Sequence, residues 1–153
     1  MAGSVVVAVR KHLVALLEAE GDLASVLIHY SFPGYQAIGK ESVTFGPAEA
    51  VVEPASHRAV KIRREETYVQ RCSIGVAGDG ITQEAADERC AEILATIEGL
   101  MAVQANVALT GAAGVDQQIL HCYLSSWRQT SGPTEDGHGA GLDAGFTVTA
   151  RSL

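Results

Sequence analysis

The spacing of the apolar residues changes from every second position to helical spacing in the middle of the chain. Between Thr67 and Val76 apolar and polar residues alternate, which predicts a β-strand with one face in the core. The residues on that face are Tyr68, Cys72, Ile74 and Val76. Gly78-Asp79-Gly80 breaks the strand, and Thr82 stands where the N-cap of a helix is expected.

The helix that follows is predicted to be amphipathic. Its apolar residues fall within an arc of roughly 120°, the width expected of a helix that lies on a sheet. These residues are Ala86, Cys90, Ile93, Leu94, Ile97, Leu100 and Met101. The opposite arc is acidic and carries Glu84, Asp87, Glu88, Glu92 and Glu98. This strand, turn and helix form the unit around which the rest of the chain is organised.

The N-terminal third predicts one helix and two short strands. Ser4 can cap a helix whose apolar residues repeat at helical spacing, and Gly21 can end it. A strand is expected at Ser25–Tyr30, and a second at Glu41–Phe45, stopped by Gly46-Pro47. We interpret Ala48–Ala59 as a surface connection, because a proline within it argues against a long element.

The C-terminal third predicts a long hairpin. Gln118–Arg128 is expected to be a strand with apolar residues on both faces, which indicates that both faces are covered. One face has Leu120, Cys122 and Leu124, and the other has Ile119, Tyr123 and Trp127. Thr130–Asp143 is rich in glycine and is expected to form a mobile tip. The alternation around Phe146–Ala150 predicts the closing strand.

Together these elements predict an α+β fold. We expect a mixed or antiparallel sheet with two main helices packed on one face and a long C-terminal β-hairpin. The chain of 153 residues, 47% of them hydrophobic, has the length of one domain with a real core. We therefore expect a single domain over residues 1–153.

Charge and cysteine content narrow the function classes. The formal net charge of -7 argues against a protein that grips DNA or RNA, because such binding needs a concentrated basic face. The apolar run Val5–Val9 is interrupted by Arg10-Lys11-His12 and is too short for a signal core or a membrane span. Three cysteines without a CxxC pair fit a reducing compartment, so we expect a cytoplasmic protein that does not enter a membrane.

No pattern predicts catalysis, a cofactor or a metal. The glycines of Gly137–Gly141 precede a strand, whereas a dinucleotide fingerprint follows a strand and opens a helix. We expect Cys72, Cys90 and Cys122 to lie in the core as free thiols. The five histidines are scattered, and neither HExxH nor G-x-S-x-G occurs. The charged run Lys61–Glu66 is open to two interpretations, a solvated edge or a set of inter-subunit contacts.

The order of elements resembles that of a known family, the tail terminator proteins of long-tailed siphophages. This family includes the lambda type and its relatives in phages of actinobacteria. The matching features follow an N-terminal helix. They are Glu41-Ser42-Val43-Thr44-Phe45-Gly46, Arg64-Glu65-Glu66 leading into the strand Thr67–Val76, the glycine turn, the acidic helix Glu84–Ile97, and two closing strands that end in Ala150-Arg151-Ser152-Leu153. The resemblance spans most of the chain. Ala48–Ala59 and Thr130–Asp143 match least.

The resemblance implies a non-enzymatic virion protein without a cofactor. Such proteins form a homo-oligomeric ring, in the expected form a hexamer, that caps the tail tube, stops its elongation and offers a surface to the neck or head-completion protein. DNA then passes through the channel without specific binding. The expected location is the tail-neck junction of the virion, reached after assembly in the host cytoplasm. The candidate inter-subunit or partner contacts are Arg63, Arg64, Glu65, Glu66, Tyr123, Trp127, Asp136, His138 and Arg151.

Two other classes stay open at this point. One is another neck, head-completion or tail-tube structural protein with the same build. The other is a small ligand-binding module or enzyme, which would need converging polar groups that the sequence does not reveal.

Overall fold

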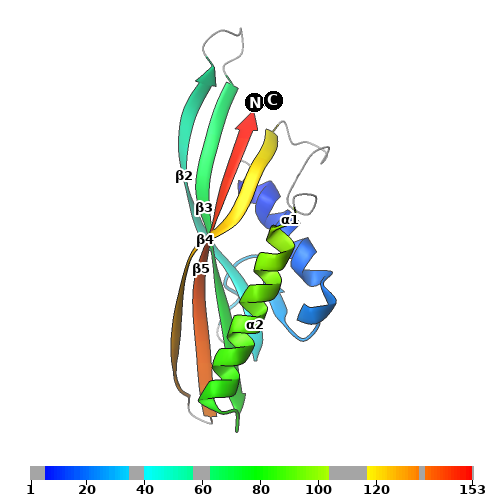
Figure 1. Ribbon diagram of the computed structural model, residues 1–153, viewed down its shortest axis with the longest axis vertical. Coiled ribbons are helices and arrows are strands. Elements are labelled where there is room, and N and C mark those ends of the chain that lie inside the picture. The colour runs from blue at the N-terminus through cyan, green and yellow to red at the C-terminus, as the bar shows by residue number, and fades with distance from the viewer. Residues whose placement is uncertain (1–5, 35–39, 57–62, 104–116, 135–136, 153) are drawn as a thin grey trace.

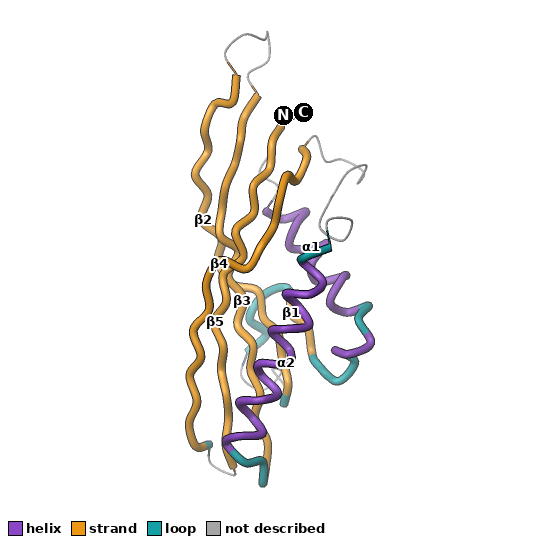
Figure 2. The backbone as a smooth tube through the Cα atoms, viewed as in Figure 1, coloured by secondary structure: helices purple, strands orange, loops and turns teal. Residues whose placement is uncertain are grey.

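The computed structural model describes residues 6–34, 40–56, 63–103, 117–134 and 137–152. Within these ranges it contains one five-stranded sheet in the order β1-β2-β3-β5-β4, with two α-helices (Figures 1 and 2). The elements are α1 Val6–Glu18, a 3₁₀ turn Gly21–Leu23, β1 Leu27–His29, β2 Glu41–Ser56, β3 Arg63–Asp79, α2 Gln83–Met101, β4 Gln117–Pro133 and β5 Gly137–Ser152. Strand β1 pairs parallel to β2, and all other pairs are antiparallel. The predicted α+β class, with its C-terminal strand pair, is confirmed.

The core lies between the two helices and one face of the sheet, which we call the helix face. The predicted core residues of β3 are all buried, with Tyr68 and Ile74 each 1% exposed. Strand β5 adds Phe146, Val148 and Ala150, each 0% exposed. The predicted apolar arc of α2 is buried except for Leu100, which is half-buried. The change of period in the sequence therefore located the central packing unit correctly.

The start of α2 forms as its residue types predict. Gly80 has a φ of 71°, which a side chain would disfavour, and it turns the chain at the end of β3. The Thr82 side chain then accepts a hydrogen bond of 3.2 Å from the amide of Ala85. This N-cap satisfies one of the free N–H groups of the first helical turn.

The predicted stop at Gly46-Pro47 is wrong, because β2 continues to Ser56. The pairing with β3 shifts register between Phe45 and Ala48, which places the proline in a bulge. Strand β1 reaches only as far as Thr44, and no other described strand pairs with that edge of β2. Proline has no backbone N–H, and on an unpaired edge no neighbouring strand needs that donor, so no hydrogen bond of the sheet is lost. The surface connection predicted at Ala48–Ala59 is therefore strand up to Ser56, and the remainder lies outside the described residues.

A partly buried network of hydrogen bonds connects the bulge to α1. Arg10 donates to the Gly46 carbonyl oxygen (Nη2 to O, 2.7 Å), and so does Gln70 (Nε2 to O, 2.9 Å). Arg10 Nε also donates to Gln70 Oε1 at 3.2 Å, and the guanidinium lies 5.0 Å from the ring centroid of Tyr30. Gln70 is 0% exposed, and burying its side-chain amide without hydrogen bonds would cost free energy. These hydrogen bonds satisfy that amide.

The glycine-rich stretch is part of the sheet and is not the predicted mobile tip. Strand β4 runs to Pro133, β5 begins at Gly137, and the amide of Thr134 donates to the Gly137 carbonyl at 2.9 Å. The ladder between β3 and β5 continues to the pair Asp79–Gly137. Glycine lets β5 approach the turn before α2, so it serves close packing here. This requirement comes from the tertiary structure and is invisible in local composition.

Candidate assembly surfaces

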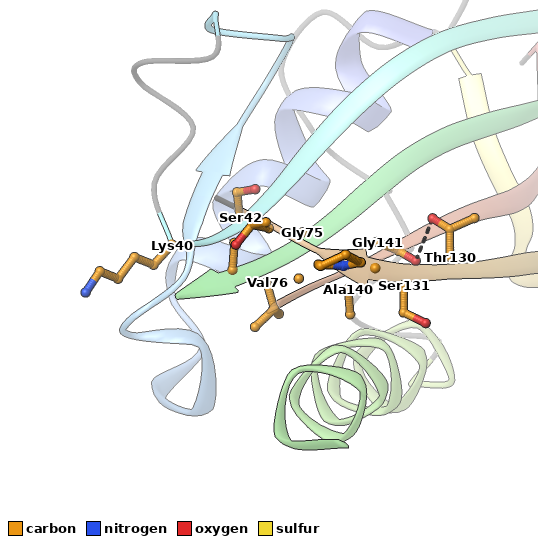
Figure 3. Close-up of a pocket in the computed structure, with 13 residues that line it drawn as sticks. Lys40, Ser42, Gly75, Val76, Thr130, Ser131, Ala140 and Gly141 are labelled. Carbon is orange, nitrogen blue, oxygen red and sulfur yellow. Dashed lines mark hydrogen bonds between the residues drawn. The ribbon is translucent and has the colours of Figure 1, made fainter. Parts of the chain in front are cut away.

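The sheet face opposite the helices, which we call the outer face, has a shallow depression with a glycine floor. Gly75, Gly139 and Gly141 lie next to one another on β3 and β5, between Ser42 on β2 and Thr130 on β4 (Figure 3). The depression encloses about 380 Å³, and we call it the glycine trough. Its lining residues are Lys40, Ser42, Gly75, Val76, Ala77, Thr130, Ser131, Gly132, Pro133, Thr134, Gly139, Ala140 and Gly141.

A second depression continues from the trough towards β1. It shares Ser42 and Gly75 with the trough, encloses about 300 Å³, and is called the Phe32 hollow here. Its lining residues are Phe32, Ser42, Thr44, Phe45, Gly46, Ser73, Ile74 and Gly75. Phe32 is 53% exposed. The two depressions together cross β2, β3 and β5.

One polar group in the Phe32 hollow is unpaired. Thr44 is only 8% exposed, and its hydroxyl oxygen has no hydrogen-bond partner among the described residues. His29 Nε2 and Tyr68 OH are also buried without a partner among the residues that the structure describes, but neither residue lines this hollow. The neighbouring Ser73 hydroxyl is paired, since it donates to Asp143 Oδ1 at 2.8 Å. The Thr44 hydroxyl oxygen is itself buried, so it lies beneath the surface of the hollow and does not face its open space.

The two predicted aromatic contacts on β4 are both exposed, Tyr123 by 52% and Trp127 by 60%. The prediction that they share one face is wrong. A register shift between Leu124 and Ser126 places Trp127 opposite Ala144, which is buried on the helix face. Tyr123 is paired with Thr147 on the outer face, where its ring centroid lies 6.0 Å from that of His121.

Two of the charged residues that enter β3, Glu65 and Glu66, are only partly solvated. Glu66 is 6% exposed, so the solvated-edge interpretation fails at this position, and Glu65 is half-buried. In the backbone register Glu65 stands opposite Arg151 of β5. Arg63 and Arg64 begin β3 at the end of the hairpin with β2 that runs past both helices (Figure 1). The structure therefore brings the predicted residues 63–66 and 151 to one end of the sheet.

The last two candidate contacts lie at the other end of the sheet. His138 is half-buried, and its Nδ1 lies 3.0 Å from the Ile81 carbonyl oxygen in the turn before α2. It is therefore packed against the protein itself and is separate from the charged group at the opposite end. Asp136 lies outside the described residues.

The three cysteines lack the features of reactive thiols. Burial raises the pKa of the Cys72 thiol to about 12, and the pKa values of Cys90 and Cys122 to about 11, so all three remain protonated and unreactive at neutral pH. Among these residues no group of three His, Cys, Asp or Glu side chains could hold a metal ion. In the same part of the chain, no helix has the length and apolar character needed to cross a membrane.

Sequence reasoning missed the trough and the hollow, although one signal for the trough was present. Glycines at 137, 139 and 141 recur with the period of a strand, so one face of that strand carries no side chains. Nothing in the local sequence indicated that Gly75 and Ser42 would adjoin this face. Their proximity depends on the pairing of β2, β3 and β5.

Comparison with known proteins shows a shared fold. No protein-family model matches the chain. No curated protein matches it either. Among solved structures the chain is similar to one from the "Virion of native gene transfer agent (GTA) particle", with 16% sequence identity and a TM-score of 0.59. The match covers 99% of this chain and 100% of that chain, so the similarity extends over the whole fold.

Proposed function

We propose that the protein is a structural virion component that caps a phage-type tail tube as a ring, in the expected form a hexamer. It stops tube elongation and presents a surface for attachment of the neck and head. The observation that carries this proposal is the end-to-end fold similarity to a chain of a gene transfer agent virion. The resemblance of the sequence to siphophage tail terminators supports the more specific role.

The sheet favours assembly through unlike edges. No described strand pairs with the outer edge of β4 along Gln117–Pro133, or with β2 beyond Thr44. Unpaired edges are templates for association, and contacts between two different edges generate rings when the rotation closes. Exposed aromatic residues on β4 and in the segment after β1 add apolar area at both sides.

The charge of the chain suits a passage for DNA. With a formal net charge of -7, a ring of such subunits repels phosphates and lets DNA move through without being held. The partners in this proposal are copies of the same chain, the tail tube protein and a neck or head-completion protein. The charged group at residues 63–66 and 151 and the aromatic residues of β4 are proposed to contribute to these contacts.

The main alternative is another structural protein of the neck or tube, which would share fold and oligomeric habit. An enzymatic or ligand-binding role has less support, because the described part of the chain shows no converging reactive groups. The alternative structural role differs from the proposed one in location within the particle.

Electron cryo-microscopy of complete particles tests the proposal. We expect density for this chain as a ring between the last tube ring and the neck. Deleting the gene should give tails of uncontrolled length that do not join heads. If another protein occupies the tail-to-neck junction and this chain lies within the neck or along the tube, the structural alternative replaces the terminator role. If the chain is absent from the particles, a virion role is wrong.

A further inference from the structure

The sheet has two free edges that lie at the same level of its strands. Strand β1 pairs with β2 only at Ser42–Thr44, so the described sheet has five strands at that level and four strands further along β2. In the upper half of Figure 1 these four strands lie side by side. There, no described strand pairs with the outer edge of β2 or with that of β4.

The backbone register connects the two free edges residue by residue. Each residue of β2 from Ala48 to Glu53 leads through β3 and β5 to one residue of β4 between Gln118 and Leu124. In the order β2, β3, β5 and β4, the rungs are Ala48/Gln70/Phe146/Leu124, Glu49/Val69/Thr147/Tyr123, Ala50/Tyr68/Val148/Cys122, Val51/Thr67/Thr149/His121, Val52/Glu66/Ala150/Ile119 and Glu53/Glu65/Arg151/Gln118. The two free edges therefore match in length and in level.

The strand directions make the two edges complementary in copies of the same orientation. From β2 to β4 the three pairings are all antiparallel, so β4 runs opposite to β2. Copies in a ring share one orientation about the ring axis, so β4 of one copy would meet β2 of the next as an antiparallel pair. Because the two edges are level, this pair needs no shift along the strands from copy to copy, which suits a ring that closes on itself.

The β4 edge lacks most of the features that prevent edge strands from associating. Natural edge strands are blunted by charged residues, by proline or by bulges. The segment Gln117–Trp127 contains neither proline nor a charged residue, and its interruptions are the register shifts at Leu120 and Ser125. On β2 the run Ala48–Glu53 is free of proline and ends at Pro54. The backbone of both edges is therefore open to pairing with another strand.

The residue types favour pairing of unlike edges over pairing of two β2 edges. Strand β2 has glutamate at positions 49 and 53, so two β2 edges in antiparallel pairing would bring like charges close together, which destabilises cross-strand pairs. The β4 residues at the same levels, Tyr123 and Gln118, are uncharged. The apolar core also reaches both edges, because Leu124 of β4 and Ala48 of β2 pack against it at the same level.

We propose that the edge Gln118–Leu124 of β4 in one copy pairs antiparallel with the edge Ala48–Glu53 of β2 in the next copy, with Tyr123 opposite Glu49. The sheet then continues from copy to copy. This inference rests on the proposed ring assembly and identifies the strands that form its contact. The contact is heterologous, because unlike edges meet, so each copy binds two neighbours.

A pair of cysteines placed across the proposed junction tests it. The double variant Tyr123→Cys/Glu49→Cys carries one new thiol on each edge, and the three native cysteines are buried and do not compete. Opposite residues of an antiparallel pair have Cα atoms about 4.5–5.5 Å apart, within the range that a disulfide spans. Particles assembled with this variant are oxidised mildly, and their chains are separated by denaturing electrophoresis without reductant. We expect a ladder of cross-linked chains that extends beyond two copies, because each copy is joined to two neighbours.

Arg128→Cys/Glu49→Cys is the matched control. Arg128 is exposed on the same strand, but its rung leads to Thr44, where β1 covers the edge of β2. We therefore expect about tenfold less cross-linked chain than in the first variant, because the two thiols are too far apart for a disulfide. Tyr123 and Arg128 are both exposed, so the variants should fold, and circular dichroism during heating checks this.

The outcomes separate this contact from the ring proposal itself. Equal yields from the two double variants, or cross-linked species that stop at two copies, would overturn the inference. Particles that contain the variant chain but give no cross-link would also overturn it, while the ring proposal keeps its own test by electron cryo-microscopy. Particles that lack even the native chain would overturn the virion role and this inference together.

Discussion

Replacing Gly137 by alanine tests whether the glycine-rich stretch is a packed strand. A Cβ at this position would meet the Gly78 carbonyl oxygen closer than real Cβ contacts occur, with Gly80 N at 3.2 Å and Gly78 C at 3.3 Å. All three atoms belong to backbone at the turn before α2, which cannot move aside as the end of a flexible side chain can. Overpacking of this kind costs about 1–3 kcal/mol, partly offset by about 0.4–1 kcal/mol from the lower entropy of the unfolded chain.

We therefore expect a net loss of about 1–2 kcal/mol in the free energy of unfolding for Gly137→Ala. In a chain of this length, that loss lowers the melting temperature by about 2–8 °C. Circular dichroism during heating and during urea titration measures both quantities. A linker of the kind predicted from composition would tolerate the substitution without any change.

Gly132→Ala is the matched control in the same hairpin. A Cβ there meets no atom of the described residues within 4 Å, and its φ is not positive, so the native conformation accepts alanine. The unfolded chain loses entropy, and the melting temperature should rise by about 1–4 °C. If both substitutions changed stability in the same direction and by the same amount, Gly137 would not lie against Gly78 and the described register of β3 with β5 would be wrong.

Three further predictions concern the core and its polar contacts. Thr82→Ala should lower the free energy of unfolding by about 1 kcal/mol in urea titration through loss of the N-cap, and Thr82→Ser should restore most of it. The thiols of Cys72, Cys90 and Cys122 should not react with a thiol reagent at pH 8 until the protein unfolds. Replacing each cysteine by alanine or valine should lower the free energy of unfolding by on the order of 1 kcal/mol without changing assembly. Stoichiometric zinc in the purified protein that is lost with these substitutions would contradict the prediction. Glu41 accepts from Arg89 at 2.7 Å, which lowers the pKa of Glu41 below its ordinary value of 4.5. The stabilisation is therefore present above 4.5 and is lost as the pH falls through the lowered pKa. Glu41→Gln should be less stable than the native chain at pH 7, and the difference should shrink as the pH falls below 4.5, as measured by urea titration.

Local sequence predicted the unit from Thr67 to Met101 well because its structure depends on local signals. The alternation in β3, the turn at Gly80 and the cap at Thr82 each act within a few residues. Long-range packing then agrees with those preferences, so the buried face of α2 matches the apolar arc. Wherever local and tertiary preferences coincide in this way, reading the sequence is sufficient.

The errors arise where a neighbouring strand decides the outcome. Pro47 was predicted to end the strand, yet it is tolerated within β2 because that edge of β2 has no described strand partner. Trp127 reads as a residue on the same face as Tyr123, yet a bulge moves it to the other face. Neither the edge position nor the bulge leaves a local signal. The exposed aromatic residues of β4 could be found from the sequence, but the Phe32 hollow could be found only in the assembled sheet.

At some glycines of the sheet, packing within the chain leaves no room for a side chain, whereas at others it does not exclude one. At Gly137 the added Cβ would collide with backbone, and at Gly145 it would lie 2.8 Å from Ser126 Oγ and 3.0 Å from Val69 Cγ1, so internal packing accounts for both. At Gly75 and Gly141 the nearest atoms are hydroxyl oxygens, of Ser42 at 3.3 Å and of Thr130 at 3.2 Å, which can move by a few tenths of an ångström. Glycine within a strand costs about 0.5–1 kcal/mol relative to alanine, and internal packing does not fully account for that cost at these two positions. Both line the glycine trough beside the Phe32 hollow, where an approaching subunit would meet bare backbone. The glycines of the trough therefore leave backbone uncovered on the outer face for a reason that packing within the described residues does not supply.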